Sequence, residues 1–218
     1  MINFESLPSG APSDGLAITT QYASTLGVTF SLENGSPMYL AQVGGARTAF
    51  EGPAGADLPA SGQGVGAFFL TDKFGPLTPA IPQGAIIGFS TLQGSVSGDI
   101  LDIDGVEAWR VEARDASGAI LDSQVYDTSH AEAGDGIATT WSFQRSQNSI
   151  ASIRIAYIGG TLHDIGFALD NFAFNTLPTI GTEEEVTDVP EPSGSWSLVV
   201  IGAAAAFLRR WRLLIRSA

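Results

Sequence analysis

The sequence contains no cysteine, which removes several stabilising and catalytic devices at once. No disulfide can cross-link the chain, so a packed core or a bound metal has to supply its stability. Zinc–thiolate centres, iron–sulfur clusters and thiol nucleophiles are excluded for the same reason. Histidine is nearly absent too: His130 and His163 stand in no metal-ligand spacing, and we expect both at the surface.

Basic residues are scarce and unevenly placed. The chain has 10 Lys and Arg against 23 Asp and Glu, and four of the ten basic residues lie in the last ten positions. The part before Trp196 therefore carries 6 − 23 = −17. Nucleic acid is excluded as a partner, because its binding relies on basic groups that neutralise phosphates. Such acidity suits a soluble extracellular domain or one that gathers divalent cations, and it also simply favours solubility.

Long helical patterns are missing from residues 1–175. Glycine and proline (26 and 11 residues) punctuate short apolar runs, which is typical of many short strands. We therefore predict an all-β fold, an antiparallel β-sandwich or barrel; a β-solenoid would need a fixed repeat, and none is present. The predicted strands cover residues 2–4, 16–22, 27–32, 67–70, 85–90, 106–114, 119–126, 139–143, 150–157 and 166–174.

Residues 176–195 differ in composition from the body. They are acidic, contain several prolines and have few large apolar side chains, so we expect a disordered linker. Thirteen uncharged residues, 196–208, follow, and then an arginine cluster. As a helix this run spans about 20 Å, which is short of the ~30 Å hydrocarbon core of a bilayer. Snorkelling arginines extend its reach and would hold the C-terminus in the cytoplasm, so we predict a short transmembrane helix within 196–218.

The end of the chain resembles a known sorting signal. Val189, Pro190, Glu191 and Pro192 precede the apolar run, and the arginines that follow it are Arg209, Arg210 and Arg212. This order of parts is similar to the PEP-CTERM signal of Gram-negative bacteria, which an exosortase processes. The resemblance implies export, transient anchoring in the inner membrane, cleavage near the Pro-Glu-Pro motif, and a final place at the cell surface or outside the cell, often in exopolysaccharide or biofilm matrix.

Such proteins normally begin with a secretory signal peptide. Residues 1–5 show no positive region and no apolar stretch before the first predicted strand. We therefore expect a leader that either lies upstream of the printed start or has already been removed.

The body is also similar to jelly-roll, galactose-binding-like sandwiches. The likeness rests on INFESLP at 2–8 with QYA at 21–23 and GVTF at 27–30, on VEARDASG at 111–118 and on IGFALDNFAF at 165–174. It implies that the first and last strands lie close together, which would bring Glu5 and Asp170 near each other. Carbohydrate-binding modules of this shape often hold a structural Ca²⁺ there, and carboxylates are ligands that Ca²⁺ prefers. The two acids are either such ligands or ordinary strand-edge acids.

Other motifs give weaker evidence of function. Asp99, Asp102 and Asp104 with Gly105 resemble part of a calcium loop. Only Asp102-Ile103-Asp104-Gly105 is in step with that pattern, and Glu107 is misplaced for it, so we predict a hairpin turn at Asp104-Gly105. The glycines at 62–66 match the spacing of a dinucleotide-binding motif, but no predicted strand directly precedes them and no predicted helix follows, so we predict a loop. We predict Trp109 in the core, whereas Trp141 suits either the core or a sugar-stacking face.

Three functions remain open. The sequence favours a non-enzymatic surface or matrix protein whose sandwich binds carbohydrate. The second reading is a secreted hydrolase of polysaccharide or ester, which would need a catalytic pair or triad; no Gly-x-Ser-x-Gly elbow is present. The third is a membrane protein that keeps its tail uncleaved.

Overall fold

A computed structural model describes residues 1–45, 58–72, 82–134, 136–159 and 168–176. The chain divides into two units, Met1–Pro178 and Thr179–Ala218. The second unit lies outside the described residues, and with it nearly all of the predicted linker and the whole sorting tail. Within the described ranges, no helix has the length and hydropathy needed to cross a membrane.

The described residues of the first unit lie almost entirely in strands and turns, with one short helix, α1 (Ala23–Leu26). The strands are β1 (Ala17–Ile18), β2 (Val28–Leu32), β3 (Met38–Gln42), β4 (Phe68–Thr71), β5 (Ala85–Gln93), β6 (Ser95–Leu101), β7 (Ala108–Arg114), β8 (Ile120–Asp127), β9 (Ala138–Gln144), β10 (Ile150–Tyr157) and β11 (Ala168–Asn175).

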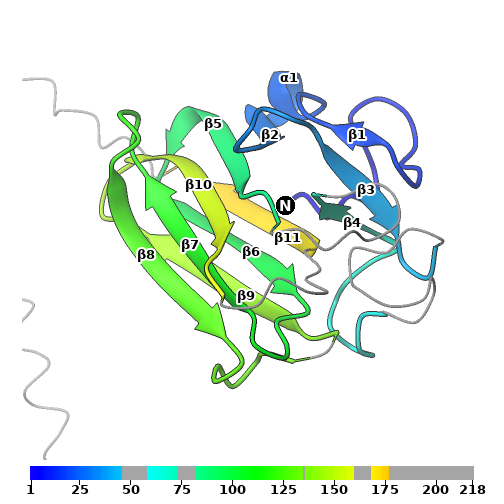
Figure 1. Cartoon of the computed structure of the whole chain (residues 1–218). Helices are drawn as coiled ribbons and strands as arrows, with labels where there is room; N and C mark the ends of the chain where they lie inside the picture. Colours follow the sequence, from blue (N-terminus) through cyan, green and yellow to red (C-terminus); the bar gives the residue numbers. More distant parts are fainter. Residues whose placement is uncertain (46–57, 73–81, 135, 160–167, 177–218) are drawn as a thin grey trace, which may run out of the picture. The chain divides into compact units, whose positions relative to one another are not determined.

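These strands form two antiparallel sheets (Figure 1). The six-stranded sheet has the order β1-β3-β4-β11-β6-β9, and the five-stranded sheet has the order β2-β5-β10-β7-β8. The N-terminal segment joins the first sheet through a single bridge between Ile2 and Phe172. The predicted all-β antiparallel sandwich is therefore confirmed, and the chain's first segment lies against its last strand.

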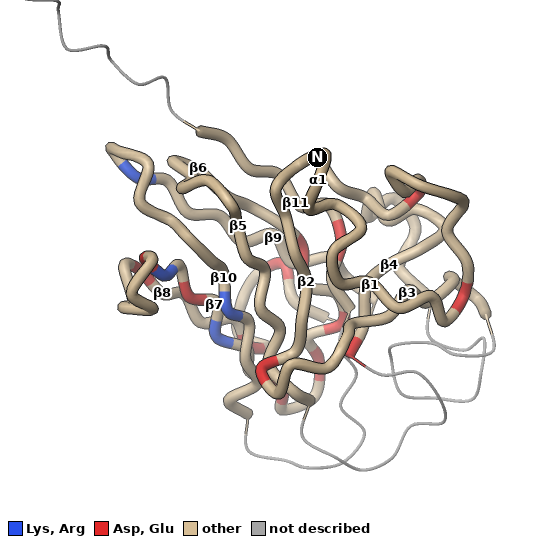
Figure 2. Tube along the Cα trace, turned by 90° about the horizontal axis from the view of Figure 1, so that it is seen from above, with Lys and Arg blue, Asp and Glu red and all other residues tan. Residues whose placement is uncertain are grey.

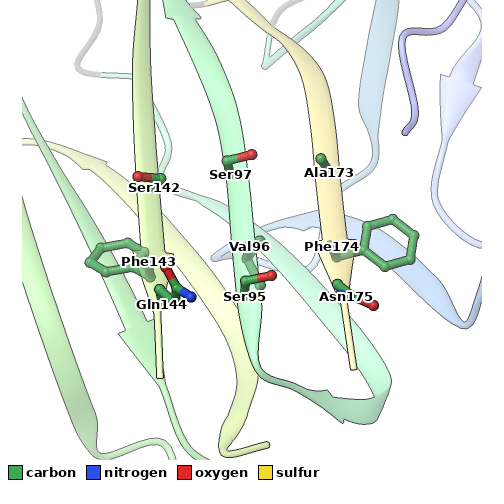
Figure 3. Close-up of a pocket in the computed structure, with 9 residues that line it drawn as sticks. All are labelled: Ser95, Val96, Ser97, Ser142, Phe143, Gln144, Ala173, Phe174 and Asn175. Atoms are coloured by element: carbon green, nitrogen blue, oxygen red, sulfur yellow. The ribbon is translucent and has the colours of Figure 1, made fainter. Parts of the chain in front are cut away.

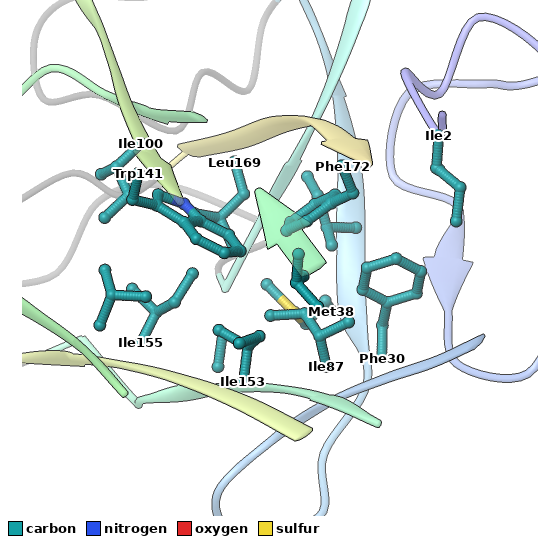
Figure 4. Packing of buried hydrophobic residues seen from close by; sticks show 14 of the residues in the cluster. Ile2, Phe30, Met38, Ile87, Ile100, Trp141, Ile153, Ile155, Leu169 and Phe172 are labelled. Atoms are coloured by element: carbon teal, nitrogen blue, oxygen red, sulfur yellow. The ribbon is translucent and has the colours of Figure 1, made fainter. Parts of the chain in front are cut away.

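The core lies between the two sheets because apolar residues alternate along the strands. In β9, Thr139, Trp141 and Phe143 are buried, while the residues between them are exposed. Figure 4 shows Trp141, Leu169 and Phe172 of one sheet facing Ile153 and Ile155 of the other. Trp109, predicted in the core, is 1% exposed, and Trp141, left open by the sequence, is fully buried.

Trp141 fits because β6 has no side chain at Gly98. A Cβ built there would lie 2.7 Å from the Trp141 ring and 3.0 Å from the Phe172 ring. Any side chain at this position would therefore push apart the two rings that fill the centre of the core.

A second, smaller apolar cluster lies on the outer face of the six-stranded sheet. Ala41, Phe69, Leu101 and Ala168 alternate with residues of the main core, so they point away from it. Val65, from the loop that precedes β4, packs over them. This loop covers one end of the outer face, and the glycines at 62–66 lie in it as predicted.

Three predictions of local structure need correction. Residues 2–4 make one bridge rather than a strand, since Phe4 has a φ of 57° that no extended strand allows. The strand predicted over 16–22 stops at Ile18, because the Gln21 side chain accepts from Thr19 N–H and donates to Ala17 O, both at 2.6 Å. Asp104 does accept a turn hydrogen bond from Glu107, but β6 and β7 belong to different sheets, so this turn is not a hairpin.

The hairpin predicted over 106–126 is confirmed as β7 and β8. Gly118 N–H donates to Asp115 O at 3.0 Å, which closes the predicted turn. The Asp115 carboxylate also accepts hydrogen bonds from the Ser117 hydroxyl and from the backbone N–H groups of Ser117 and Ala119. These bonds lower the pKa of Asp115, and the Ser117 hydroxyl has the largest effect.

Candidate functional site

The outer face of β9, β6 and β11 carries a continuous set of polar side chains next to the covered end. Ser97 pairs with Ser142 of β9 and Ala173 of β11. Two residues further along, Asp99 pairs with Thr140 and Asp170. A two-residue step in a strand is about 6.6 Å, so an acidic cluster and a neutral polar groove are neighbours on one surface.

The acidic cluster contains both acids singled out by the sequence. Asp170 lies in β11, and the negative charges of Asp99 and Glu5 act on it. Glu5 Oε1 accepts from Phe68 N–H at 3.0 Å, and a Cβ at Gly66 would lie 2.0 Å from the same oxygen. The loop before β4 can therefore pass over Glu5 only because residue 66 is glycine.

Asp99 and Asn171 complete the cluster, and neither was predicted to belong to it. Asn171 Nδ2 donates to Asp99 Oδ2 at 2.9 Å and to Gly64 O at 3.3 Å. Thr140 Oγ1 donates to Asp99 Oδ1 at 2.7 Å. A bulge between Asp170 and Ala173, with Asn171 at a φ of 55°, aims this amide into the cluster.

Asp170 is the buried centre of this cluster, with no exposed surface. Its Oδ1 accepts from Asn171 N–H at 2.8 Å, whereas its Oδ2 is buried without a hydrogen-bond partner. Burial raises the pKa of Asp170 to about 7; the Asn171 and Gly66 amides oppose this rise, and Asp99 and Glu5 add to it. A buried carboxylate oxygen with no donor is costly, and a cation would remove that cost.

The oxygen chemistry of the cluster fits a hard cation. Carboxylates of Glu5, Asp99 and Asp170, the Gly64 carbonyl and the Asn171 amide are all oxygen sources of the kind Ca²⁺ takes. Among the described residues, however, no three acidic or histidine side chains already stand together as a ligand set. The unpartnered oxygen of Asp170 is therefore the observation that points to a cation here.

Beyond the cluster the same face opens into a groove of about 220 Å³ (Figure 3). Ser142, Ser97 and Ala173 cross the three strands in one row, and Gln144, Ser95 and Asn175 in the next. Phe174 also borders the groove, but its ring is on the core side of the sheet and packs against Phe89 of β5 at 5.8 Å between ring centroids. The lining offers hydroxyl and amide groups and contains no carboxylate and no histidine.

Aromatic side chains do not form an open stacking platform on the described surface. The large apolar side chains exposed there are all aliphatic or methionine: Met1, Leu26, Leu58, Leu92, Val106, Ile120, Val125 and Ile158. A sugar bound in the groove would therefore be held by hydrogen bonds.

Glu107 is a second buried acid, on the turn before β7. It is 6% exposed and accepts from Trp109 Nε1 at 3.3 Å. Burial raises its pKa to about 8; the Trp109 hydrogen bond opposes the rise, and Asp102 and Asp104 reinforce it. Glu107 is thus protonated at neutral pH in the folded chain.

We predict that Glu107→Gln makes stability less dependent on pH. Because the folded pKa lies above the unfolded one, the protonated acid supports folding fully below about pH 4.5, and this support is lost as pH rises toward 8. The loss amounts to about 1.4 kcal/mol per pH unit. Thermal melts should show variant and wild type similar at pH 5, with the variant more stable at pH 8; a constant difference would contradict this.

The remaining predicted residues divide between surface and undescribed chain. His130 is exposed and contacts the Tyr126 ring edge-on at 5.0 Å. His163 lies outside the described residues. So do the sorting-signal residues Val189, Pro190, Glu191, Pro192, Arg209, Arg210 and Arg212.

Comparisons with known proteins give structural likenesses only. No family model matches the chain, and no curated protein matches it. It is similar to TmCBM61 in complex with β-1,4-galactotriose (9% identity, 69% of this chain, 88% of that chain, TM-score 0.41). It is also similar to the K3 cleaved adhesin domain of Lys-gingipain from Porphyromonas gingivalis (15%, 75% and 99%, TM-score 0.42) and to the CBM22-1 xylan-binding domain of Paenibacillus barcinonensis Xyn10C (15%, 77% and 99%, TM-score 0.34). These likenesses assign no ligand to this chain.

Proposed function

We propose that the chain is an exported bacterial protein of the cell surface or extracellular matrix, with a non-catalytic jelly-roll body that binds carbohydrate. The groove on the outer face of β9, β6 and β11 is the observation that carries the binding role. Its hydroxyl and amide groups suit the hydroxyl groups of a neutral sugar. A hydrolase would need paired carboxylates or a triad in the groove, and its lining provides neither.

The export part of the proposal rests on the sequence of the tail. Pro190-Glu191-Pro192, the apolar run and the arginine cluster occur in the order of an exosortase substrate. An exosortase and, transiently, the inner membrane are therefore the processing partners in this proposal. The strongly acidic body, which contains no cysteine, is compatible with an extracellular location.

We also propose that Ca²⁺ binds the acidic cluster beside the groove. Asp170 would supply its unpartnered Oδ2, and Glu5 and Asp99 would add carboxylate oxygens after their side chains turn toward the ion. When bound, the ion supplies positive charge to the buried carboxylate of Asp170, whose Oδ2 otherwise has no donor. Because β6 and β11 carry both cluster and groove, the ion would also fix the strands that position Ser97 and Ala173.

A glycan array on the full chain, with and without Ca²⁺, tests the carbohydrate role. We expect binding to neutral polysaccharide fragments, and Gln144→Ala should weaken it about threefold to tenfold, the value of one hydrogen bond. Gln147→Ala is the matched control, since Gln147 is also an exposed glutamine but does not line the groove. An array without hits, or equal losses in the two variants, would refute the groove as the site.

A further inference from the structure

The strand β9, which carries Ser142 and Gln144 of the groove, is the outermost strand of the six-stranded sheet. Among the described strands only β6 pairs with it, over residues 138–144 and without a bulge. In an antiparallel pair, alternate residues turn their N–H and C=O groups toward the partner, and the residues between them turn these groups outward. One side of β9 therefore presents backbone groups that no described strand satisfies.

The other outer strands, β1, β2 and β8, are protected in ways that natural sheets commonly use. β1 has only two residues, and β2 bonds the segment before it, since Phe30 N–H donates to Thr19 O at 2.8 Å. β8 carries Asp122 and Asp127, and its pairing with β7 contains a register shift. Figure 2 shows charged segments beside β7 and β8. β9 has none of these devices, because its sequence, Ala-Thr-Thr-Trp-Ser-Phe-Gln, contains no charged residue and no proline.

Two glutamine side chains cap the outward groups of β9 instead. At the start of the strand, Gln63 Oε1 accepts from Ala138 N–H at 3.0 Å. Near its middle, Gln124 Nε2 donates to Ser142 O at 2.9 Å. Ala138 and Ser142 are an even number of residues apart, so both turn their backbone groups to the same side. Gln124 belongs to β8, the outermost strand of the other sheet, so its bond joins the two sheets at this edge of the sandwich.

Gln124 is itself held by a bond from its own strand. Tyr126 Oη donates to Gln124 Oε1 at 2.6 Å, and Tyr126 is 7% exposed. Both residues lie on the core side of β8, since they pair with Val111 and Trp109 of β7, which belong to the core. A backbone carbonyl only accepts hydrogen bonds, so Nε2 of this amide has to face Ser142 and Oε1 has to face Tyr126. With both ends of the amide in use, the side chain has one orientation.

The bond from Gln124 reaches the groove through a single peptide group. The carbonyl that it holds belongs to Ser142, whose side chain lines the groove (Figure 3). Within the described residues, the side chains of Ser142 and Gln144 make no hydrogen bond of their own. Only the backbone of β9 places them, and that backbone has a neighbouring strand on one side alone.

From these contacts we infer that Gln124, oriented by Tyr126, is a positioning residue of the groove: it fixes the free edge of β9 and thereby the direction of the Ser142 hydroxyl. The inference rests on the proposed carbohydrate role of the groove. Gln124 does not line the groove, so its effect on a bound sugar passes through β9.

Hydrogen exchange of the full chain without ligand tests the first step. Gln124→Met keeps the length of the side chain and removes both bonds, so the amides of residues 138–144 should exchange about threefold to tenfold faster, the value of one hydrogen bond. Tyr126→Phe leaves the amide in place without the group that orients it, so it should give a smaller rise.

Gln21→Met is the matched control. Gln21 is also half-buried, and its amide also accepts with Oε1 and donates with Nε2 to a backbone carbonyl. These bonds lie beside β1, at the opposite edge of the same sheet. The control variant therefore loses the same kind of bonds and should leave the exchange of residues 138–144 unchanged.

A double-mutant cycle with Ser142→Ala tests the second step. The probe is the neutral oligosaccharide that gives the strongest wild-type signal on the glycan array. Gln124→Met should weaken its binding about threefold to tenfold in the wild-type background, and less than twofold in the Ser142→Ala background, because the hydroxyl that Gln124 positions is then absent. Gln21→Met should change binding less than twofold in both backgrounds.

Several results would overturn the inference. Unchanged exchange of residues 138–144 in Gln124→Met does so whatever the array shows. Equal losses of affinity in the two backgrounds, or the same loss in Gln21→Met, would mean that Gln124 acts on general stability alone. An array without hits refutes the groove as a site and this inference with it, whereas hits that do not depend on Gln124 refute this inference alone.

Discussion

Addition of millimolar Ca²⁺ to the chelator-treated protein should raise its melting temperature by about 5–10 °C. A ligand present at about 100 times its Kd stabilises the folded state by about 2.7 kcal/mol, and 1 kcal/mol corresponds to about 2–4 °C in a chain of this size. Asp170→Asn should abolish the shift, because it removes the buried carboxylate whose Oδ2 has no other partner.

The same variant should behave differently without the ion. Asparagine carries no charge, so the metal-free Asp170→Asn protein should be at least as stable as the metal-free wild type. Asp122→Asn is the matched control: Asp122 is an exposed acid on β8, far from the cluster in the sheet order, and its loss should leave the Ca²⁺ shift intact. An unchanged wild-type melt, or a full shift in Asp170→Asn, would eliminate the calcium site.

Local patterns in the sequence predicted the parts of the fold in which apolar alternation and turn residues agree. The β7–β8 hairpin is the clearest case, since alternating residues flank an Asp-x-x-Gly turn. The strands β9 and β10 were predicted almost to their ends for the same reason.

Two strands, β6 and β3, were not predicted from the sequence, and their residues explain why. β6 begins Ser-Val-Ser-Gly-Asp, a composition more typical of a loop. Its Gly98 leaves room for the Trp141 and Phe172 rings of β9 and β11, which lie beside it in the fold. β3 is a short strand, Met38–Gln42, with apolar residues on both faces because the second cluster covers its outer side. In both cases the deciding contacts are distant in sequence.

The candidate site was predicted in part. Pairing of the first and last segments placed Glu5 and Asp170 together, but Asp99 entered the cluster through β6, which the sequence analysis did not recognise as a strand. The groove had no sequence signal, since serine, glutamine and asparagine at alternate positions describe any solvent-facing sheet. Only the register of β9, β6 and β11 brings these side chains into one surface.

The largest effect on the cell is expected from the sorting motif. Replacing Pro190, Glu191 and Pro192 with alanine should leave nearly all of the protein in the inner-membrane fraction with its tail attached. The arginines Arg209, Arg210 and Arg212 would still hold the C-terminus on the cytoplasmic side. Alanine at Glu183, Glu184 and Glu185 is the control, because it changes the same acidic stretch without altering the motif.

The proposed function depends above all on export with removal of the C-terminal tail, and intact-mass spectrometry of the wild-type protein recovered from the cell surface tests it most directly. We predict a mass that ends near Pro190-Glu191-Pro192, so that the apolar run and the arginine cluster are both missing. A surface-located protein that still carries residues 209–218, or a protein found only inside the cell, would contradict the account.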